Sequence, residues 1–116
     1  MTVYVDDVQH HFGHMIMRHL WADTLDELLT MVDIIGVQLK WIQGHPELSF
    51  GKHRNASWVH FDISISKKKI AIQLGAILTD KYGPSEHVAR LKGNQKRLDQ
   101  ITACRAIKMR KRAFLF

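Results

Sequence analysis

The strongest structural signal in the sequence is a helix start at Thr24-Leu25-Asp26-Glu27. In this pattern, a Thr and a Glu three residues apart satisfy backbone amides that have no partner in the first turn of a helix. Apolar residues then recur at helical spacing as far as Ile35, and Gly36 follows as a typical terminating residue. The sequence therefore predicts a helix over residues 25–35, with one apolar face that must pack on another element.

The segments around this helix are typical of strands and loops. Residues 2–5 and 15–21 are rich in apolar residues and are predicted to be strands, with a polar loop at 9–14 between them. Residues 37–42 alternate between apolar and polar, which predicts a strand directly after the helix. Residues 43–55 contain two glycines and a proline, and we expect a long loop of the kind that often carries function.

The second half of the chain continues the alternation of helices and strands. Its predicted elements are, in order, an extended segment at 57–63, a helix from Ser64 or Ser66 to Leu74, a strand at 76–79, a helix from about Ser85, and a last helix from Asn94 to about Lys111.

This order of elements is typical of α/β proteins. Helices that pass through a glycine into a strand, as at Ile35-Gly36-Val37 and Leu74-Gly75-Ala76, return the chain to the same sheet. We expect a small α/β fold with a partly parallel sheet of about four strands, flanking helices and a basic C-terminal helix. Residues 1–93 would form the core domain, and residues 94–116 the basic helix and an apolar end that packs on the core or on a partner.

The composition limits the class of protein. A chain of 116 residues with 46% apolar residues can form one modest core, and no apolar run approaches the roughly 20 residues of a membrane span. The single cysteine, Cys104, excludes an internal disulfide, and the acidic start of the chain does not resemble a signal peptide. These features predict a cytoplasmic protein that does not enter a membrane.

The positive charge is concentrated at the C-terminal end. The formal net charge is +6, and from Arg90 onward nine Lys/Arg residues face a single acid, Asp99. Such a segment is typical of proteins that bind a polyanion, although a solvated helix face is equally compatible with it. Lys67-Lys68-Lys69 also open a predicted helix, where cations oppose the helix dipole and favour an anion nearby. The candidate anion-binding residues are Lys96, Arg97, Arg105, Lys108, Arg110, Lys111 and Arg112.

The central stretch, residues 57–63, is the candidate floor of a polar site. In an extended segment side chains alternate, so His60 and Asp62 point to one face and the apolar residues between them to the other. Ionisable groups on such an apolar element need partners or a ligand, because burying them unpaired is costly.

Other imidazoles and carboxylates could join this pair. The candidate catalytic residues are Asp6, His19, Asp23, His60 and Asp62, and the candidate metal ligands are Asp6, His60 and Asp62. Together they suit a divalent metal ion or an acid/base pair, but their spacing matches no established metal or nucleophile motif. Structural roles stay open: Asp6 can end a turn, and Asp23 can cap the helix beside Thr24. The tract of His10, His11 and His14 is expected to be flexible and to bind metal only accidentally.

Several short motifs occur in an order that resembles a known family. They are Val3-Tyr4-Val5-Asp6, His19-Leu20-Trp21-Ala22-Asp23-Thr24, Gly36 with Lys40-Trp41, His60-Phe61-Asp62-Ile63 and Gly75-Ala76. The chain resembles, over roughly its first 80 residues, domain-of-unknown-function family 4031, small proteins of phages and bacteria. The family carries His-Tyr-Asp where this chain has Phe61, and often a histidine where it has Leu29. The resemblance implies a phage or bacterial origin and a cytoplasmic setting, in the host cytoplasm if phage-encoded, but no activity.

Two functions follow from these features. The first is a metal- or acid/base-dependent hydrolase of a phosphate-containing substrate, a nucleotide or nucleic acid, with a divalent metal as the cofactor. The alternative is a non-catalytic phage accessory protein that binds nucleic acid or a host protein through its basic C-terminal helix. The apolar end at 113–116 could also dock on the core or form an oligomer.

Overall fold

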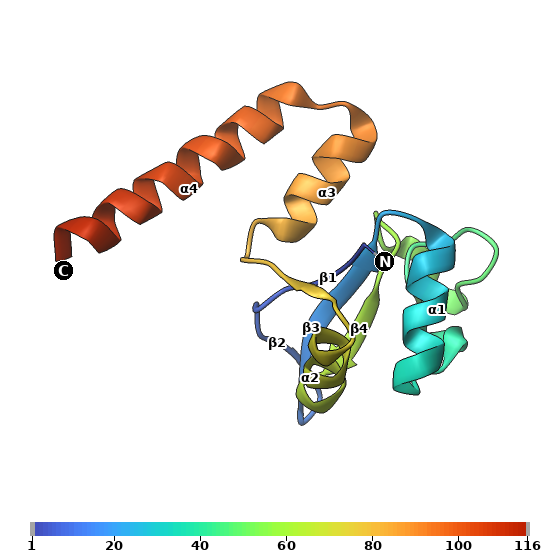
Figure 1. Ribbon diagram of the computed structural model, residues 1–116. Helices are drawn as coiled ribbons and strands as arrows, with labels where there is room; N and C mark the ends of the chain where they lie inside the picture. Colours follow the sequence, from blue (N-terminus) through green and yellow to red (C-terminus); the bar gives the residue numbers. More distant parts are fainter. Residues whose placement is uncertain (1, 116) are drawn as a thin grey trace. The chain divides into compact units, whose positions relative to one another are not determined.

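The computed structural model describes residues 2–115, except for the side chains of Phe12, Phe114 and Leu115 (Figure 1). The chain divides into two compact units, Met1–Lys81 and Tyr82–Phe116. The predicted boundary after residue 93 stays a prediction. The predicted docking of the apolar end at 113–116 depends on side chains that lie outside the described residues.

The first unit is built on a mixed five-stranded sheet with β3 (Met15–Ala22) at its centre. Met17 pairs with both His10 and Ser64, and Leu20 pairs with both Val5 and Phe61, so β3 has one partner strand on each edge at both positions. One edge of β3 is shared by β1 (Val3–Val5) and β2 (His10–Phe12), and the other edge is taken by β4 (Phe61–Ser64). The fifth strand, β5 (Ile77–Leu78), runs parallel to β1. This confirms the predicted α/β fold and its partly parallel sheet.

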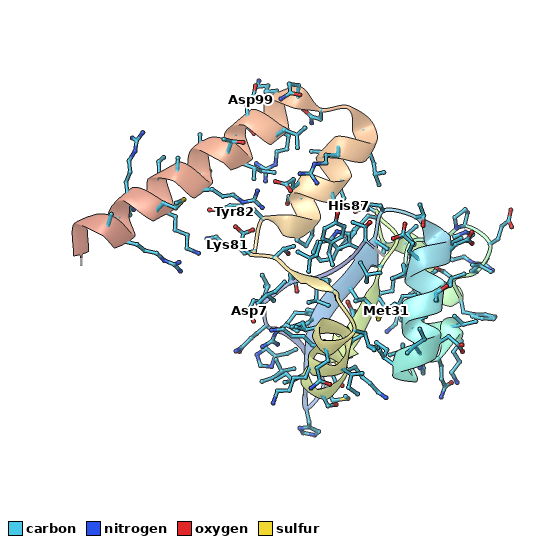
Figure 2. The ribbon with its side chains drawn as sticks, viewed as in Figure 1. Asp7, Met31, Lys81, Tyr82, His87 and Asp99 are labelled. Carbon is cyan, nitrogen blue, oxygen red and sulfur yellow. The ribbon has the colours of Figure 1, made fainter. Side chains whose placement is uncertain are left out.

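The two faces of the sheet carry different kinds of side chain, because side chains alternate along each strand. One face packs on the helices α1 (Leu25–Ile35) and α2 (Ile65–Gln73). The buried residues of this layer are Val3, Val5, Leu20, Phe61 and Ile63 from the sheet, and Leu28, Met31, Val32, Ile35 and Ala71 from the helices (Met31 is labelled in Figure 2). The opposite face carries Tyr4, Met17, His19, Trp21 and Asp62, which the strand register places side by side.

The predicted capping of α1 is confirmed. The Thr24 hydroxyl accepts a hydrogen bond from the Glu27 amide at 3.3 Å and donates one to Glu27 Oε1 at 2.9 Å. The other carboxylate oxygen of Glu27 accepts a hydrogen bond from the Thr2 amide, so the cap also ties the helix to the start of β1. These hydrogen bonds hold the pKa of Glu27 below its ordinary value. Gly36 ends the helix at φ 80°, as expected.

The lysines at the start of α2 have partners within the protein. Ser64 caps this helix, and Lys67 Nζ donates to the carbonyl oxygen of Ile35, at the negative end of α1, at 2.6 Å. Lys68 Nζ lies 2.6 Å from Asp7 Oδ1, and this hydrogen bond and charge lower the pKa of the Asp7 carboxyl. The anion that the lysine run predicted is therefore supplied, for Lys68, by the protein itself.

The predicted loop at 9–14 is wrong. Gly13 and His14 form a two-residue turn, with Gly13 at φ 61°, between the paired strands β2 and β3. A glycine with positive φ in such a turn is typical of tight β-hairpins. The polarity of His10 and His11 misled the prediction, because this hairpin does not bury an apolar face at that point.

The predicted strand at 37–42 is also wrong. Residues Leu39–Trp41 form a single 3₁₀ turn, and Leu39 and Trp41, which the alternation would have buried, are each about half exposed (52% and 48%). Only the next residues reach the core and the sheet. Ile42 is buried, and Gln43 makes an isolated antiparallel bridge to His60. The rest of the predicted loop contains a second 3₁₀ turn, Gly51–Asn55.

The second unit is a pair of helices. α3 (Gly83–Lys92) ends at Gly93, and α4 (Gln95–Leu115) begins where Asn94 Oδ1 accepts a hydrogen bond from the Arg97 amide at 3.0 Å. Glu86 of α3 forms ion pairs with Arg90 and with Arg105 of α4. Both helices were predicted. In the described part of the chain, no helix has the length and hydropathy needed to cross a membrane.

The loop before β4 depends on a glycine that approaches the backbone closely, and this gives a testable prediction. Gly44 has φ 78°, and a Cβ atom there would overlap the carbonyl group of Trp58. Gly51 has φ 53° but open space around it. We expect Gly44→Ala to lower the free energy of unfolding by about 1–3 kcal/mol more than Gly51→Ala, because positive φ destabilises both variants but only the first overlaps backbone. Urea denaturation of both variants measures the difference, and equal losses would contradict the close approach.

Candidate metal centre

A cluster of imidazoles and carboxylates lies on the sheet face opposite the helices. His19 on β3 is directly opposite Asp62 on β4, and His10 on β2 is opposite Met17, one position along the same face. His60 precedes β4 and is held by two backbone hydrogen bonds to Gln43, of 2.9 and 3.1 Å. Three strands thus bring these residues together from three parts of the sequence, and the bridge to Gln43 holds His60 beside them.

One oxygen atom, Asp62 Oδ1, is the centre of the cluster. It lies 3.4 Å from His10 Nε2, 3.5 Å from His60 Nε2 and 4.0 Å from His19 Nε2. The ligand atoms of His10, His19 and Asp62 all lie within 4.8 Å of one another. Although they are buried, Asp62 Oδ1 and His10 Nε2 have no hydrogen-bond partner among the described residues.

Hydrogen bonds on the far side of two rings fix where their protons lie. His19 Nδ1 is 2.6 Å from Asp6 Oδ2, and His60 Nδ1 is 3.0 Å from the carbonyl oxygen of Trp58. Since a carboxylate and a carbonyl can only accept, both Nδ1 atoms must be the donors. In the neutral form of each ring, Nε2 then carries a lone pair, and in both rings Nε2 is the atom that faces Asp62.

In the neutral form of both rings, this arrangement brings two lone pairs toward one carboxylate oxygen. Two imidazole lone pairs directed at a carboxylate oxygen repel it, and the buried oxygen gains no compensating hydrogen bond from the described residues. A proton on one Nε2 or a metal cation between the groups removes this repulsion. The donor set of the cluster, imidazole and carboxylate, is of the kind that suits a divalent transition metal.

The ionisation of Asp62 and His10 fits this description. Burial disfavours the charge on Asp62, but hydrogen bonds from Gln43 and from protonated His60, together with the charges of protonated His60 and His10, outweigh that effect at the acidic pH where Asp62 titrates, so the pKa of Asp62 lies below its ordinary value. The carboxylate is thus ionised at neutral pH. For His10 burial is the largest effect, and it lowers the pKa despite the neighbouring Asp62 carboxylate. His10 is therefore neutral at pH 7, the form that binds metal.

The rings are also held by stacking. His10 stacks on His19 with centroids 4.4 Å apart, and His60 stacks on Trp58 at 4.1 Å. Trp58 in turn packs edge-on against Trp21, at 5.6 Å. These contacts limit the rotation of the imidazoles, so the direction of each Nε2 atom is set by packing as well as by hydrogen bonds.

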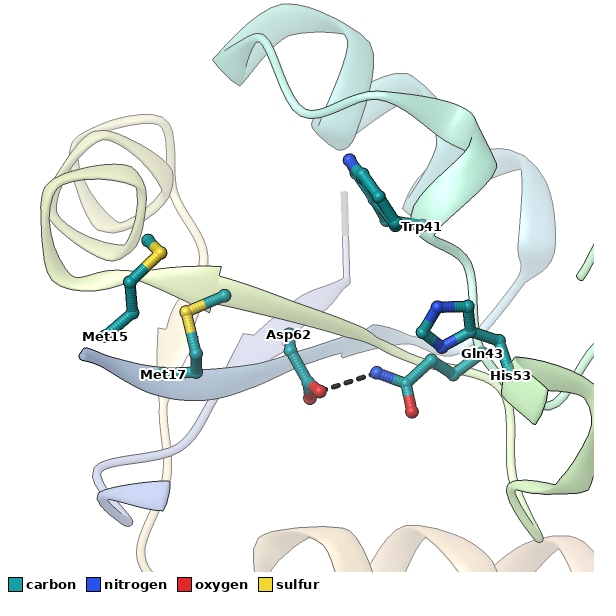
Figure 3. Close-up of a pocket in the computed structure, with 6 residues that line it drawn as sticks. All are labelled: Met15, Met17, Trp41, Gln43, His53 and Asp62. Carbon is teal, nitrogen blue, oxygen red and sulfur yellow. Dashed lines mark hydrogen bonds between the residues drawn. The ribbon is translucent and has the colours of Figure 1, made fainter. Parts of the chain in front are cut away.

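A cavity of about 320 Å³ opens beside the cluster (Figure 3). Its lining residues are Met15, Met17, Trp41, Gln43, His53 and Asp62. Gln43 Nε2 donates to Asp62 Oδ2 at 2.5 Å, so the second oxygen of this carboxylate is fixed from the side of the cavity. Asp62 therefore belongs both to the cluster and to the cavity wall.

The structure brings together four of the five predicted catalytic residues: Asp6, His19, His60 and Asp62. Asp6 is fully buried and lies behind His19, where its oxygens accept from the His19 amide at 3.0 Å and from the ring. It is placed to orient an imidazole, and the other two predicted metal ligands, His60 and Asp62, lie in the cluster itself. For Asp23 the structure shows a different contact, because its carboxylate accepts a hydrogen bond from the Tyr4 hydroxyl at 3.3 Å. The catalytic roles of all five predicted residues stay predictions.

Two residues of the site were missed by sequence reasoning. His10 was assigned to a flexible tract, but the Gly13-His14 turn pairs it with β3, and that turn is the signal that could have found it. Gln43 was assigned to a loop without a role. Its contact with Asp62 depends on the bridge to His60, for which the sequence holds no local signal.

The predicted anion-binding residues lie on α4. Lys96, Arg97, Arg110, Lys111 and Arg112 are exposed, and Lys108 is partly exposed. Arg105 differs, because it forms an ion pair with Glu86 and lies over the ring of Tyr82. The helix therefore offers a cationic surface in which Arg105 also has a structural role.

The comparisons with known proteins give a family and no activity. Among curated proteins and among solved structures, none matches the chain. One family model, described as "Protein of unknown function (DUF4031)", matches residues 3–93, a range that includes every residue of the cluster and the cavity. Since this match covers most of the 116 residues, the chain belongs to the DUF4031 family.

Proposed function

We propose that this protein is a metal-dependent hydrolase of a phosphate-containing substrate, with His10, His19 and Asp62 as the metal ligands. The observation that carries the proposal is that His10 Nε2 and Asp62 Oδ1 are buried without a hydrogen-bond partner among the described residues, beside the oriented ring of His19. Two imidazoles and one carboxylate within 4.8 Å match the donor sets of catalytic zinc and non-haem iron sites.

The donor set favours some metals over others. Imidazole nitrogen binds Zn²⁺, Co²⁺ and similar ions well, whereas Mg²⁺ and Ca²⁺ prefer sites made only of oxygen. Three protein ligands also leave coordination positions for water and substrate. When bound, such an ion supplies Lewis-acid stabilisation of a phosphoryl oxygen and lowers the pKa of water.

The remaining residues have supporting roles. His60, with its Nδ1 proton held by the Trp58 carbonyl, presents a basic Nε2 beside Asp62 and serves as the proton acceptor for water. Asp6 orients His19, as carboxylates behind metal-binding histidines commonly do, and Gln43 orients Asp62. Of the three metal ligands expected from the sequence, only Asp62 is a ligand in this proposal, whereas Asp6 orients His19 and His60 accepts a proton.

The phosphate-containing substrate is supported by charge. The net charge of +6 favours the approach of anions in general, and nucleotides or nucleic acids are the common phosphate-containing anions of a cell. A divalent ion on a site with one carboxylate leaves a net positive charge there, which suits an anionic substrate.

The metal proposal predicts a specific pattern of binding. We expect Zn²⁺ and Co²⁺ to bind with one ion per chain, and excess Mg²⁺ not to compete, because the site contains two imidazoles. His10→Ala should abolish tight binding, whereas His11→Ala should not, since His11 lies on the other side of the same strand and is exposed. Asp6→Asn should weaken binding by about 10- to 100-fold, because it removes the charge behind His19. Isothermal titration calorimetry measures all four proteins.

Equal binding by the His10→Ala and His11→Ala variants would contradict this site. Thermal melts without metal serve as the control, and they must show that the variants remain folded. Acidification should also release the ion, because protons compete for the imidazole nitrogens.

The catalytic proposal separates metal binding from proton transfer. We expect the Zn²⁺- or Co²⁺-loaded protein to hydrolyse a chromogenic phosphoester such as bis(p-nitrophenyl) phosphate, and His60→Gln to lower kcat by about 10²- to 10⁴-fold while metal binding stays near that of the wild type. The reason is that His60 accepts a proton but does not hold the ion. His19→Ala should lose metal and activity together. A His60→Gln variant that is fully active would remove His60 from the mechanism.

Nucleic-acid binding by α4 is the second candidate, and it is supported by the exposed cations of this helix. We expect the double variant Lys111→Gln, Arg112→Gln to bind a DNA duplex of arbitrary sequence more weakly than the wild type. The slope of log K against the logarithm of the salt concentration should also become less steep, by about 0.9 for each phosphate that the helix no longer neutralises. Lys52→Gln with Lys69→Gln is the matched control, because it removes the same charge from exposed positions of the first unit. Fluorescence anisotropy over a salt series measures the slopes, and identical slopes for the two double variants would exclude α4.

A further inference from the structure

We propose that the cavity beside Asp62 binds a planar aromatic group of the substrate, a nucleobase or similar ring in a small phosphorylated molecule, and so places the attached phosphate at the cluster. This inference rests on the proposed function, since it names the substrate class of the same site. It is carried by the walls of the cavity, by its size and by the shared residue Asp62.

The walls of the cavity suit a flat apolar group. Figure 3 shows Met15 and Met17 on one side and Trp41 with His53 on the other, with Asp62 and Gln43 between them. Methionine thioethers adapt their shape and make favourable contacts with aromatic rings, and an indole offers a stacking surface. A ring that enters between them would contact sulfur on one side and an aromatic surface on the other.

Two of these apolar side chains remain in contact with water. Met15 is 50% exposed and Trp41 48% exposed, although both lie within the folded first unit. Trp41 is nevertheless held in place, because Lys40 Nζ lies 4.8 Å from its ring centroid and the His53 ring meets it at 85° with centroids 6.0 Å apart. Ordered but exposed apolar side chains around a cavity are typical of binding sites.

The polar atoms of the cavity could read the edge of a ring. Gln43 Nε2 donates a hydrogen bond to Asp62, and Oε1 of the same amide can then only accept one. His53 supplies a second polar edge. A few such atoms in an otherwise apolar cavity fix the orientation of a ligand, and nucleobases carry the N–H donors that an amide oxygen would accept.

The size of the cavity favours a small molecule. A volume of about 320 Å³ lies at the lower end of the range for small-ligand sites. One ring with its sugar would fill it. Since Asp62 lines the cavity with one side and faces the imidazoles with the other, a group attached to the bound ring would reach the cluster directly.

The test compares ligands that differ only in the ring. On Zn²⁺-loaded protein, we expect adenosine 5′-monophosphate to bind roughly fivefold to a hundredfold more tightly than ribose 5-phosphate, the range that stacking of a base on an aromatic side chain provides. Phenyl phosphate tests which kind of ring the cavity accepts. If it binds as tightly as adenosine 5′-monophosphate, the cavity accepts any aromatic ring; if it binds more weakly, the cavity prefers a nucleobase. Calorimetric titrations give the dissociation constants, and an assay for released phosphate checks that each ligand stays intact during its titration.

A matched pair of variants assigns the effect to the cavity. Trp41→Ala should reduce the affinity for adenosine 5′-monophosphate to near that for ribose 5-phosphate, whereas Leu39→Ala should leave it unchanged. Both residues belong to the same 3₁₀ turn and are about half exposed, but only Trp41 lines the cavity. Neither variant removes a buried core residue, so both should fold.

The outcomes separate this inference from the proposed function. If adenosine 5′-monophosphate and ribose 5-phosphate bind equally to a protein that binds Zn²⁺ and hydrolyses phosphoesters, the aromatic site is wrong and the hydrolase stands. If no metal binds, titration of the metal-free protein with adenosine still decides, because the ring site does not include the metal. Adenosine binding that is lost in Trp41→Ala supports it, and no binding overturns it.

Discussion

The polar half of this structure depends on the buried carboxylate of Asp6. It accepts the amide and the ring N–H of His19, two charge-assisted hydrogen bonds that join the end of β1 to the middle of β3. Because the side chain of Asp6 has no access to water, its oxygens depend on these two donors for their hydrogen bonds. One residue thus ties two strands together and also decides which nitrogen of His19 faces the cluster. In this site, the orientation of the His19 ring and the joining of two strands are set by the same contact.

Because side chains alternate along each strand, the first unit has an apolar half, in which the sheet packs on the helices, and a polar half, which contains the imidazole and carboxylate cluster. Leu20 and Phe61 point to the helices, and their neighbours His19 and Asp62 point the other way, so each strand contributes to both halves. The helical layer is ordinary apolar packing and needs no specific partner beyond shape. The opposite layer stacks imidazoles on indoles, and there each ring is held by a hydrogen bond or by a neighbouring ring. A substitution in the first half should alter stability, and one in the second should alter the orientation of an imidazole or a carboxylate.

The sequence predicts the parts of this structure that depend on local chemistry. The capping residues Thr24 and Glu27 and the terminating Gly36 act within one or two turns of the chain, and the structure confirms them. The strand predicted at residues 37–42 is wrong because an alternating pattern forms a strand only where a partner strand is available over several residues. Here the chain pairs with a neighbour only at Gln43. His10 was missed for a related reason. Its role depends on which residue of β3 lies opposite, and that register is fixed by the turn rather than by the histidine itself.

The same dependence on register explains why His10 and His11 differ. A shift of one residue in the β2–β3 hairpin would exchange their faces, placing His11 over His19 and His10 outside, and the cluster would still contain the same number of imidazoles. The two-residue turn with Gly13 at positive φ excludes that shift, because its geometry fixes Phe12 opposite Met15. The turn at Gly13, three residues away from His10, therefore decides which histidine of β2 belongs to the cluster. The role of Gln43 also depends on strand pairing. Its bridge to His60, just before β4, places the Gln43 side chain against Asp62 and in the wall of the cavity.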